Sequence, residues 1–121
     1  MSKPTTLPAA IEQAFTAWMW LEGRIVDFPV HARRGLGERL ATAATDVLDA
    51  LNAAAYAGSP AEREAALRHA NQRLATWRLL VRGAHELRHL SHDQHAFHAE
   101  ALGRLGADVG RWLNATRGKA R

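Results

Sequence analysis

The sequence contains no cysteine among its 121 residues, and this absence excludes disulfide bonds and thiolate metal ligands. No apolar run approaches the roughly 20 residues that a membrane-spanning helix needs. The first residues, Met1-Ser2-Lys3-Pro4, do not open a secretory signal, so we expect a cytoplasmic protein. Alternation of apolar and polar residues with period two, which is typical of half-buried strands, is also missing. The fold class that this leaves is all-α.

Arginine, by contrast, is abundant, since 14 of the 16 basic residues are arginine and the net charge is +4. Guanidinium groups bind phosphate oxygens as planar forks and stack on nucleobases. An excess of them favours acidic partners, among them nucleic acids. A chain of this length suits one domain and is too short for a core plus a separate catalytic module.

Apolar residues recur at helical spacing in four stretches, which are about 8–27, 34–57, 60–90 and 92–115. The segments Ser59-Pro60-Ala61-Glu62 and Ser91-His92-Asp93-Gln94 have the composition of helix N-terminal caps. Because the connections are short, successive helices must be antiparallel neighbours. We therefore predict an up-down-up-down antiparallel four-helix bundle in which residues 1–121 form a single domain. The basic tail, residues 116–121, is expected to be disordered.

The third predicted helix carries basic residues at spacings of four, three and four, which places them in one stripe on its surface. They are Arg78, Arg82, His85 and His89. As charges they form a track that suits a nucleic-acid backbone or an acidic protein. With basic neighbours in the expected fold, the predicted nucleic-acid-binding residues are Arg33, Arg34, Arg73, Arg78, Arg82 and His85. A solvated arginine face, partly balanced by Glu62, Glu64 and Glu86, is the alternative.

The same helix also fits a metal motif, because His85-Glu86-Leu87-Arg88-His89 matches H-E-x-x-H. In that motif two histidines one turn apart bind zinc and the glutamate is the general base. A catalytic zinc needs a third ligand and a cleft. His92 and His95 are candidates for the third ligand. However, the helix is expected to break at Ser91, and no strand is available to form a cleft. We therefore predict no catalytic residue, metal or cofactor, and expect His98, on the apolar side of the last helix, to be a hydrogen-bonded core histidine.

A second enzyme class, the helical HEPN ribonucleases, uses an arginine and a histidine four to six residues apart. The pairs Arg63 with His69 and Arg88 with His95 satisfy that spacing. In a chain so rich in both residue types, such pairs are expected by chance. We therefore keep the non-enzymatic interpretation.

Some residues do not fit a single apolar face. At 100° per residue Trp20 points about 180° from the line through Ile11 and Trp18. Three glycines share a ridge on the last helix, and they are Gly103, Gly106 and Gly110. An internal glycine costs about 0.5–1 kcal/mol relative to alanine, so we interpret the ridge and Trp20 as an oligomer interface. Tolerated glycines beside an exposed tryptophan are the alternative. Glu22, on the apolar face, is expected to pair with an arginine such as Arg39.

Short segments spread over about residues 15–114 follow one family pattern. They are Trp20, Phe28-Pro29, Arg33 or Arg34, Leu36-Gly37-Glu38-Arg39-Leu40, Ala70-Asn71-Gln72-Arg73-Leu74, Arg78-Leu79-Leu80-Val81-Arg82, Leu90-Ser91, Gln94, Phe97, Leu105-Gly106, Gly110 and Trp112-Leu113. The part around Phe28 fits F-P…R-x-x-L-G-x-x-L. In this order the segments resemble the accessory variability determinant (Avd) proteins of diversity-generating retroelements, more closely than the related four-helix proteins encoded in ribosomal-RNA intervening sequences.

The resemblance implies a four-helix bundle that assembles as a homopentameric barrel, without a known catalytic site. Such proteins bind a reverse transcriptase and nucleic acid, RNA included, and support mutagenic retrohoming. By position, Arg78, Arg82 and His85 stand where the family has basic residues, and Trp20 and the three glycines where it has an aromatic and small residues. The additional histidines, such as His92, depart from the pattern and make binding depend on pH between about 5 and 8. A bundle that binds an acidic protein or a metal, without nucleic acid, is the alternative.

Overall fold

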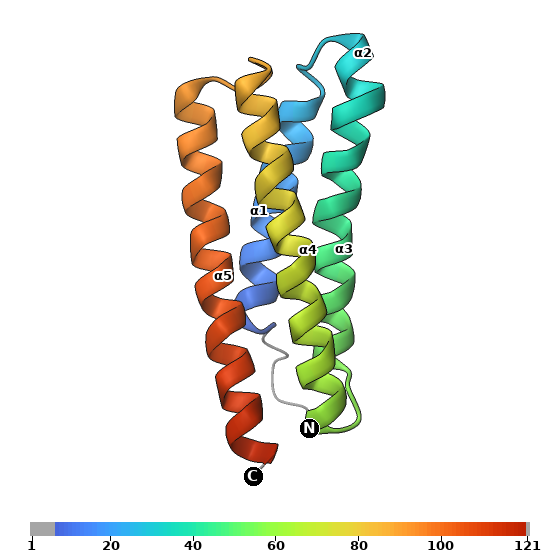
Figure 1. The fold of residues 1–121 in the computed structure, drawn as a ribbon, viewed down its shortest axis with the longest axis vertical. Coiled ribbons are helices and arrows are strands. Elements are labelled where there is room, and N and C mark those ends of the chain that lie inside the picture. Colours follow the sequence, from blue (N-terminus) through green and yellow to red (C-terminus); the bar gives the residue numbers. More distant parts are fainter. Residues whose placement is uncertain (1–6, 121) are drawn as a thin grey trace, which may run out of the picture.

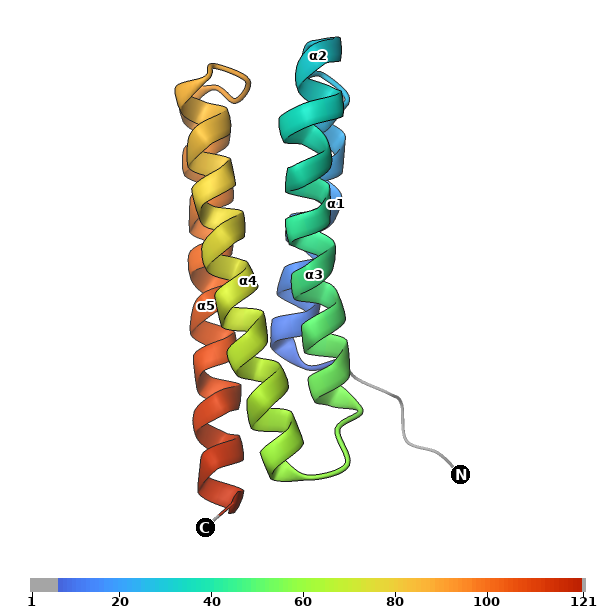
Figure 2. The same ribbon diagram turned by 45° about the vertical axis from the view of Figure 1, so that its right-hand side comes forward.

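The computed structural model describes residues 7–120, and its helices form a bundle (Figure 1). In chain order they are α1 (Ala9–Ile25), α2 (Val30–Ala32), the π-helical turn η1 (Arg33–Gly37), α3 (Glu38–Ala55), α4 (Pro60–Glu86) and α5 (His92–Ala120). The segments α2, η1 and α3 form one continuous rod, so four rods lie side by side and alternate in direction (Figure 2). Residues 7–120 contain no strand, which confirms the all-α class. Within this range, no helix combines the length and the apolar character needed to cross a bilayer.

Both predicted capping signals start a helix. The amide of Glu62 donates to Ser59 Oγ at 3.2 Å. At α5 the bonds are reciprocal, because the Gln94 amide donates to Ser91 Oγ at 3.1 Å and the Ser91 amide donates to Gln94 Oε1 at 2.9 Å. First-turn amides have no partner within a helix, so these side chains fix where α4 and α5 begin.

Helix α4 ends four residues earlier than expected, at Glu86. Arg88 adopts a left-handed conformation, with φ of 66°. Its amide donates to the carbonyl of His85 at 3.0 Å, and the His89 amide donates to the carbonyl of Ala84 at 2.8 Å. This pair of bonds is a Schellman motif, which stops the helix by capping its last carbonyls.

The last helix is longer than expected. Residues 116–120, predicted to be disordered, belong to α5, while Arg121 lies outside the described residues. The Thr116 hydroxyl donates to the Trp112 carbonyl at 2.8 Å, and Arg117 Nε lies 3.5 Å from Glu64 Oε2 on α4. The segment that was expected to be disordered therefore contacts the start of α4 through Arg117.

The core lies along the axis between the four rods. Its largest fully buried side chains are Trp77, Leu21, Leu40, Leu51, Leu67, Leu102, Leu105, His98, Val47, Val81 and Val109. His98 is completely buried and accepts a hydrogen bond from Trp77 Nε1 at 3.1 Å, which confirms the predicted core histidine. Helix α1 turns mainly alanines inward, so it packs closely on its neighbours. Phe15, by contrast, is 48% exposed.

Candidate nucleic-acid interface

The predicted stripe begins at Arg78, which lies against α5. Its Nη2 donates to the carbonyl of Leu102 at 3.0 Å. Gly106 leaves room for this guanidinium, because a Cβ at that position would collide with Arg78 Nη2. Arg78 is therefore a contact between two helices, and one of its nitrogens is already bound to protein.

The other members of the stripe also have partners. Arg82 Nε donates to Glu86 Oε2 at 2.8 Å, in an exposed pair one helical turn apart. The His85 ring stacks on His95, with centroids 4.4 Å apart and planes at 10°. Together with Arg78, these residues do not form the continuous free track that their spacing predicts.

The two histidines of the H-E-x-x-H motif contact different neighbours. The ring of His89 lies 5.4 Å from Phe28, whereas His85 faces His95 and has His92 at 5.8 Å. Lone pairs of stacked imidazoles lie in parallel planes, so those of His85 and His95 do not converge on one ion. In the described part of the chain, no group of three histidine, aspartate or glutamate side chains is arranged to hold a metal. Burial, then the charges of His85 and His92, lowers the pKa of His95.

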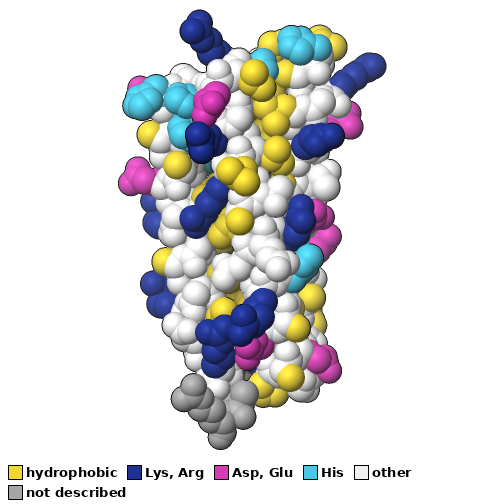
Figure 3. All heavy atoms as spheres, viewed as in Figure 1, with side chains coloured by type: hydrophobic (Ala, Val, Ile, Leu, Met, Phe, Trp, Pro, Cys, Tyr) yellow, Lys and Arg dark blue, Asp and Glu magenta, His cyan; other side chains and the backbone are white. Residues whose placement is uncertain are grey.

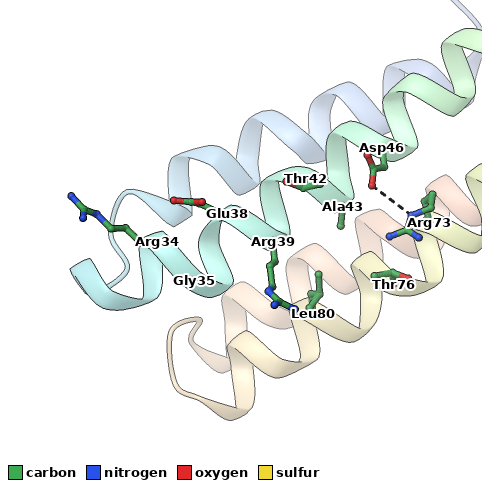
Figure 4. Close-up of a pocket in the computed structure, with 10 residues that line it drawn as sticks. All are labelled: Arg34, Gly35, Glu38, Arg39, Thr42, Ala43, Asp46, Arg73, Thr76 and Leu80. Carbon is green, nitrogen blue, oxygen red and sulfur yellow. Dashed lines mark ion pairs between the residues drawn. The ribbon is translucent and has the colours of Figure 1, made fainter.

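On the other side of α4 lies a groove of about 540 Å³, which is lined by α4 on one side and by η1 and α3 on the other (Figure 4). We call it the α3–α4 groove. It is lined by Arg34, Gly35, Glu38, Arg39, Thr42, Ala43, Asp46, Arg73, Thr76 and Leu80. Arg34 points outward at its open end, while Arg39 and Arg73 extend between the helices. On the face seen in Figure 3, basic side chains stand on both sides of a column of apolar ones.

Two of the three guanidinium groups that line the α3–α4 groove lack a carboxylate partner among residues 7–120, and the third has only a long ion pair. Arg73 Nε lies 3.6 Å from Asp46 Oδ2, too far for a hydrogen bond, and this buried nitrogen has no other partner. Arg34 and Arg39 have no carboxylate within 4.0 Å among residues 7–120. The same holds for Arg33, which is exposed and precedes Arg34 in η1. The groove thus combines positive charge with an unsatisfied buried donor.

The π-helical turn η1 positions the open end of the groove. Gly37 lies against α1, where an added Cβ would stand 2.9 Å from Ile25 Cγ2 and 3.2 Å from the Ala32 carbonyl. Only glycine, which has no side chain, allows η1 to pack this closely against the end of α1. Such turns occur frequently at functional sites.

The six predicted binding residues therefore fall into two groups. Arg34 and Arg73 line the α3–α4 groove and Arg33 precedes Arg34 in the chain, whereas Arg78, Arg82 and His85 lie on or near the α5 side of α4. The division arises because residues 73 and 78 point to opposite neighbours of α4.

The sequence prediction missed Arg39. It was assigned to a buried pair with Glu22, but Glu22 accepts a hydrogen bond from Trp18 Nε1 at 3.1 Å within α1. Arg39 instead lines the α3–α4 groove. The spacing of Arg39, Thr42 and Asp46, at three and four residues, places them on one face of α3 and was the available signal.

The predicted interface residues are partly used within the chain. Trp20 does not point away from the bundle, since its ring stacks on His98 at 4.9 Å and lies 5.4 Å from Phe97. Gly106 accommodates Arg78. Gly103 and Gly110 have open space where a side chain would stand, so these two remain available to a partner.

A different apolar surface is exposed on α1 and its C-cap residue Val26. Phe15, Met19 and Val26 are 48%, 53% and 64% exposed and recur at spacings of four and seven. At helical geometry they share one flank, which we call the α1 flank. Large apolar side chains grouped on a surface mark contacts with other proteins.

No family model matches this chain, and no curated protein matches it either. The Avd resemblance therefore stays a prediction.

Proposed function

We propose that the protein is a non-enzymatic accessory protein of a diversity-generating retroelement. In this proposal it binds a reverse transcriptase, and binds RNA or DNA through its basic surface, to support mutagenic retrohoming. The observation that carries the nucleic-acid part is the group of arginines at η1 and the start of α3, which have no carboxylate partner among residues 7–120. They are Arg33, Arg34 and Arg39.

This group differs from most other arginines in what surrounds it, since among residues 7–120 only Arg24, Arg88 and Arg104 likewise lack both a carboxylate partner and a side-chain hydrogen bond. Five arginines make ion pairs, and they are Arg68, Arg73, Arg82, Arg111 and Arg117. Arg63 and Arg78 donate to backbone carbonyls. Neighbouring guanidinium groups without counter-charges repel one another, and the phosphates of a nucleic acid relieve that repulsion.

We further propose that the protein assembles into an oligomer, a homopentameric barrel by the Avd resemblance. The α1 flank supports this part, because its exposed apolar side chains suit contact with another copy. In this proposal the α1 flank takes the place of Trp20 and Gly106 in the oligomer interface, and Gly103 and Gly110 remain part of that interface.

Electrophoretic mobility shift across a salt series tests the nucleic-acid part, with RNA and DNA strands from about 50 to 200 mM salt. Losing both charges in Arg33→Gln/Arg34→Gln is expected to reduce the log–log salt slope by about two units. The matched control, Arg68→Gln/Arg111→Gln, removes two arginines that already have carboxylate partners. Absent or salt-insensitive binding by the wild type would falsify the nucleic-acid proposal.

Light scattering tests assembly. We expect an oligomer at micromolar concentration and a shift toward monomer in Phe15→Ser/Met19→Ser, because the α1 flank loses its apolar contact. Leu87→Ser, an exposed apolar residue beyond α4, is the control. A monomeric wild type contradicts the assembly.

The retroelement assignment has its own test in the genome. A reverse transcriptase gene and paired template and variable repeats are expected near this gene, and the transcriptase is expected to co-purify with the protein. If neither is found in any genome that encodes the chain, the assignment fails while nucleic-acid binding stands.

A further inference from the structure

We propose that the α3–α4 groove holds one unpaired nucleotide of a single-stranded nucleic acid. The phosphate lies between Arg39 and Arg73, and the base lies against Ala43 and Leu80. This inference rests on the proposed function and adds to it the form of the ligand and the place where it binds.

The size and shape of the groove favour the insertion of one nucleotide over contact with the sugar–phosphate backbone of a duplex. Its volume of about 540 Å³ is within the range of roughly 300–1,000 Å³ found for small-ligand sites. A duplex keeps its bases stacked and paired inside, and its convex surface presents only phosphates and groove edges. An unpaired base, by contrast, swings out of its strand and enters a hollow.

The phosphate position follows from the two inner arginines. Arg73 Nε is buried without a hydrogen-bond partner, because its ion-pair partner Asp46 Oδ2 lies 3.6 Å away, and a buried donor of this kind gains stability when an acceptor comes closer. Arg39 approaches from the facing helix without a carboxylate of its own. A phosphate oxygen supplies the missing acceptor and binds both guanidinium groups through charge-assisted bonds.

The rest of the lining suits a base better than a second phosphate. Ala43 and Leu80 provide an apolar wall, and a guanidinium plane offers a stacking surface. Glu38 and Asp46 also line the groove, and they repel further phosphates. Carboxylates accept hydrogen bonds from the exocyclic amino groups of bases. The mixture of two acids with three arginines therefore fits a nucleotide rather than a bare anion.

Fluorescence anisotropy with a labelled single strand, and with the duplex of the same sequence, tests the proposal. The wild type is expected to bind the single strand more tightly. Arg39→Gln is expected to weaken single-strand binding about tenfold, which corresponds to one charge-assisted bond. Arg104→Gln is the matched control, because Arg104 has no carboxylate partner among residues 7–120 and lies beside Trp20 and Phe97, away from the groove.

A second variant tests the hollow without changing charge. Thr76→Phe is expected to fill the groove and weaken single-strand binding about as much as Arg39→Gln, while its circular dichroism spectrum stays that of the wild type. If Arg39→Gln and Thr76→Phe both bind like Arg104→Gln while the wild type still binds nucleic acid, the groove is overturned and the proposed function stands. If the wild type binds neither strand nor duplex, both fall together.

Nuclear magnetic resonance locates the nucleotide directly. Titration with adenosine monophosphate is expected to shift the Nε–Hε signals of Arg39 and Arg73 and the amide of Thr76, and inorganic phosphate is expected to shift them less. Shifts confined to residues outside the groove, or equal effects of the two ligands, overturn the assignment of a base site.

Discussion

The two sides of α4 use arginine in different ways. Toward α5, Arg78 donates to a backbone carbonyl and covers Gly106, so its charge is part of the packing. Toward α3, Arg39 and Arg73 line a groove, and the buried Nε of Arg73 lacks a hydrogen-bond partner. The two sides differ because of the helix that packs on each. On α5, Gly106 and the Leu102 carbonyl accommodate the guanidinium of Arg78, whereas the side facing α3 contains the α3–α4 groove. Whether an arginine is free to bind a ligand therefore depends on the residues that pack around it more than on its position in the sequence.

The largest expected effect is at His98, in the core between α4 and α5. Burial, and then the charge of His95, lowers the pKa of His98 from 6.5 to about 4. Between these values the unfolded chain binds the proton more readily than the folded one. Stability is therefore complete above pH 6.5 and is lost as the pH falls toward 4, by on the order of 3 kcal/mol. Urea denaturation at several pH values between 7 and 4 measures this loss.

The control for this effect keeps an acceptor for Trp77 but does not titrate. His98→Gln is expected to flatten the dependence of the unfolding free energy on pH, even if it lowers stability at pH 7. His69→Gln, on the exposed surface of α4, is the matched control for exchanging a histidine for a glutamine. An equal pH slope in His98→Gln and wild type contradicts the role of His98.

A smaller effect is expected where α5 accommodates Arg78. Gly106→Ala forces the guanidinium away from the Leu102 carbonyl. The lost charge-assisted bond, about 1.5–3 kcal/mol, outweighs the gain of about 1 kcal/mol in helix propensity. We expect a net destabilisation of about 1 kcal/mol in thermal or urea unfolding.

Gly110→Ala is the matched control on the same helix, because its new Cβ meets open space. It is expected to stabilise the monomer by about 0.5–1 kcal/mol. If Gly110→Ala instead reduces assembly in light scattering, the predicted glycine interface gains support. Equal effects of the two substitutions contradict the contact between Arg78 and Gly106.

The end of α4 gives a third comparison. Arg88 has a Cβ in a left-handed conformation that glycine adopts without strain. Arg88→Gly is expected to stabilise the fold by about 1 kcal/mol, measured by urea unfolding. Arg88→Ala removes the charge and keeps the Cβ, so it is expected to give no such gain. A gain in both variants attributes the effect to charge rather than to backbone conformation.

Local sequence signals predicted those parts of the fold that depend on neighbours in the chain. The serine caps at Ser59 and Ser91 and the apolar spacing that buries Trp77 and His98 are of this kind. The end of α4 was placed too late, because an arginine in the Schellman position does not announce a helix end as glycine does.

The candidate site was less predictable because it depends on how the helices pack. Arg78 and Arg73 look alike in the sequence, and only the contact of α4 with α5 assigns Arg78 to packing. Arg39 faces the groove by virtue of helical spacing, and its assignment to Glu22 overlooked that Trp18, one turn away, satisfies the carboxylate. Periodicity therefore predicts the face of a side chain, and the opposing helix determines its partner.

The smallest expected effect completes the comparison between the two sides of α4. Arg39→Met is expected to change the unfolding free energy by less than about 0.5 kcal/mol, since Arg39 makes no hydrogen bond or ion pair among residues 7–120. Arg78→Met removes a bond to α5 and is expected to cost at least about 1 kcal/mol. Urea unfolding of both variants at neutral pH measures the difference. Equal losses would mean that Arg39 stabilises the fold as Arg78 does, and Arg39 would then not be reserved for a ligand.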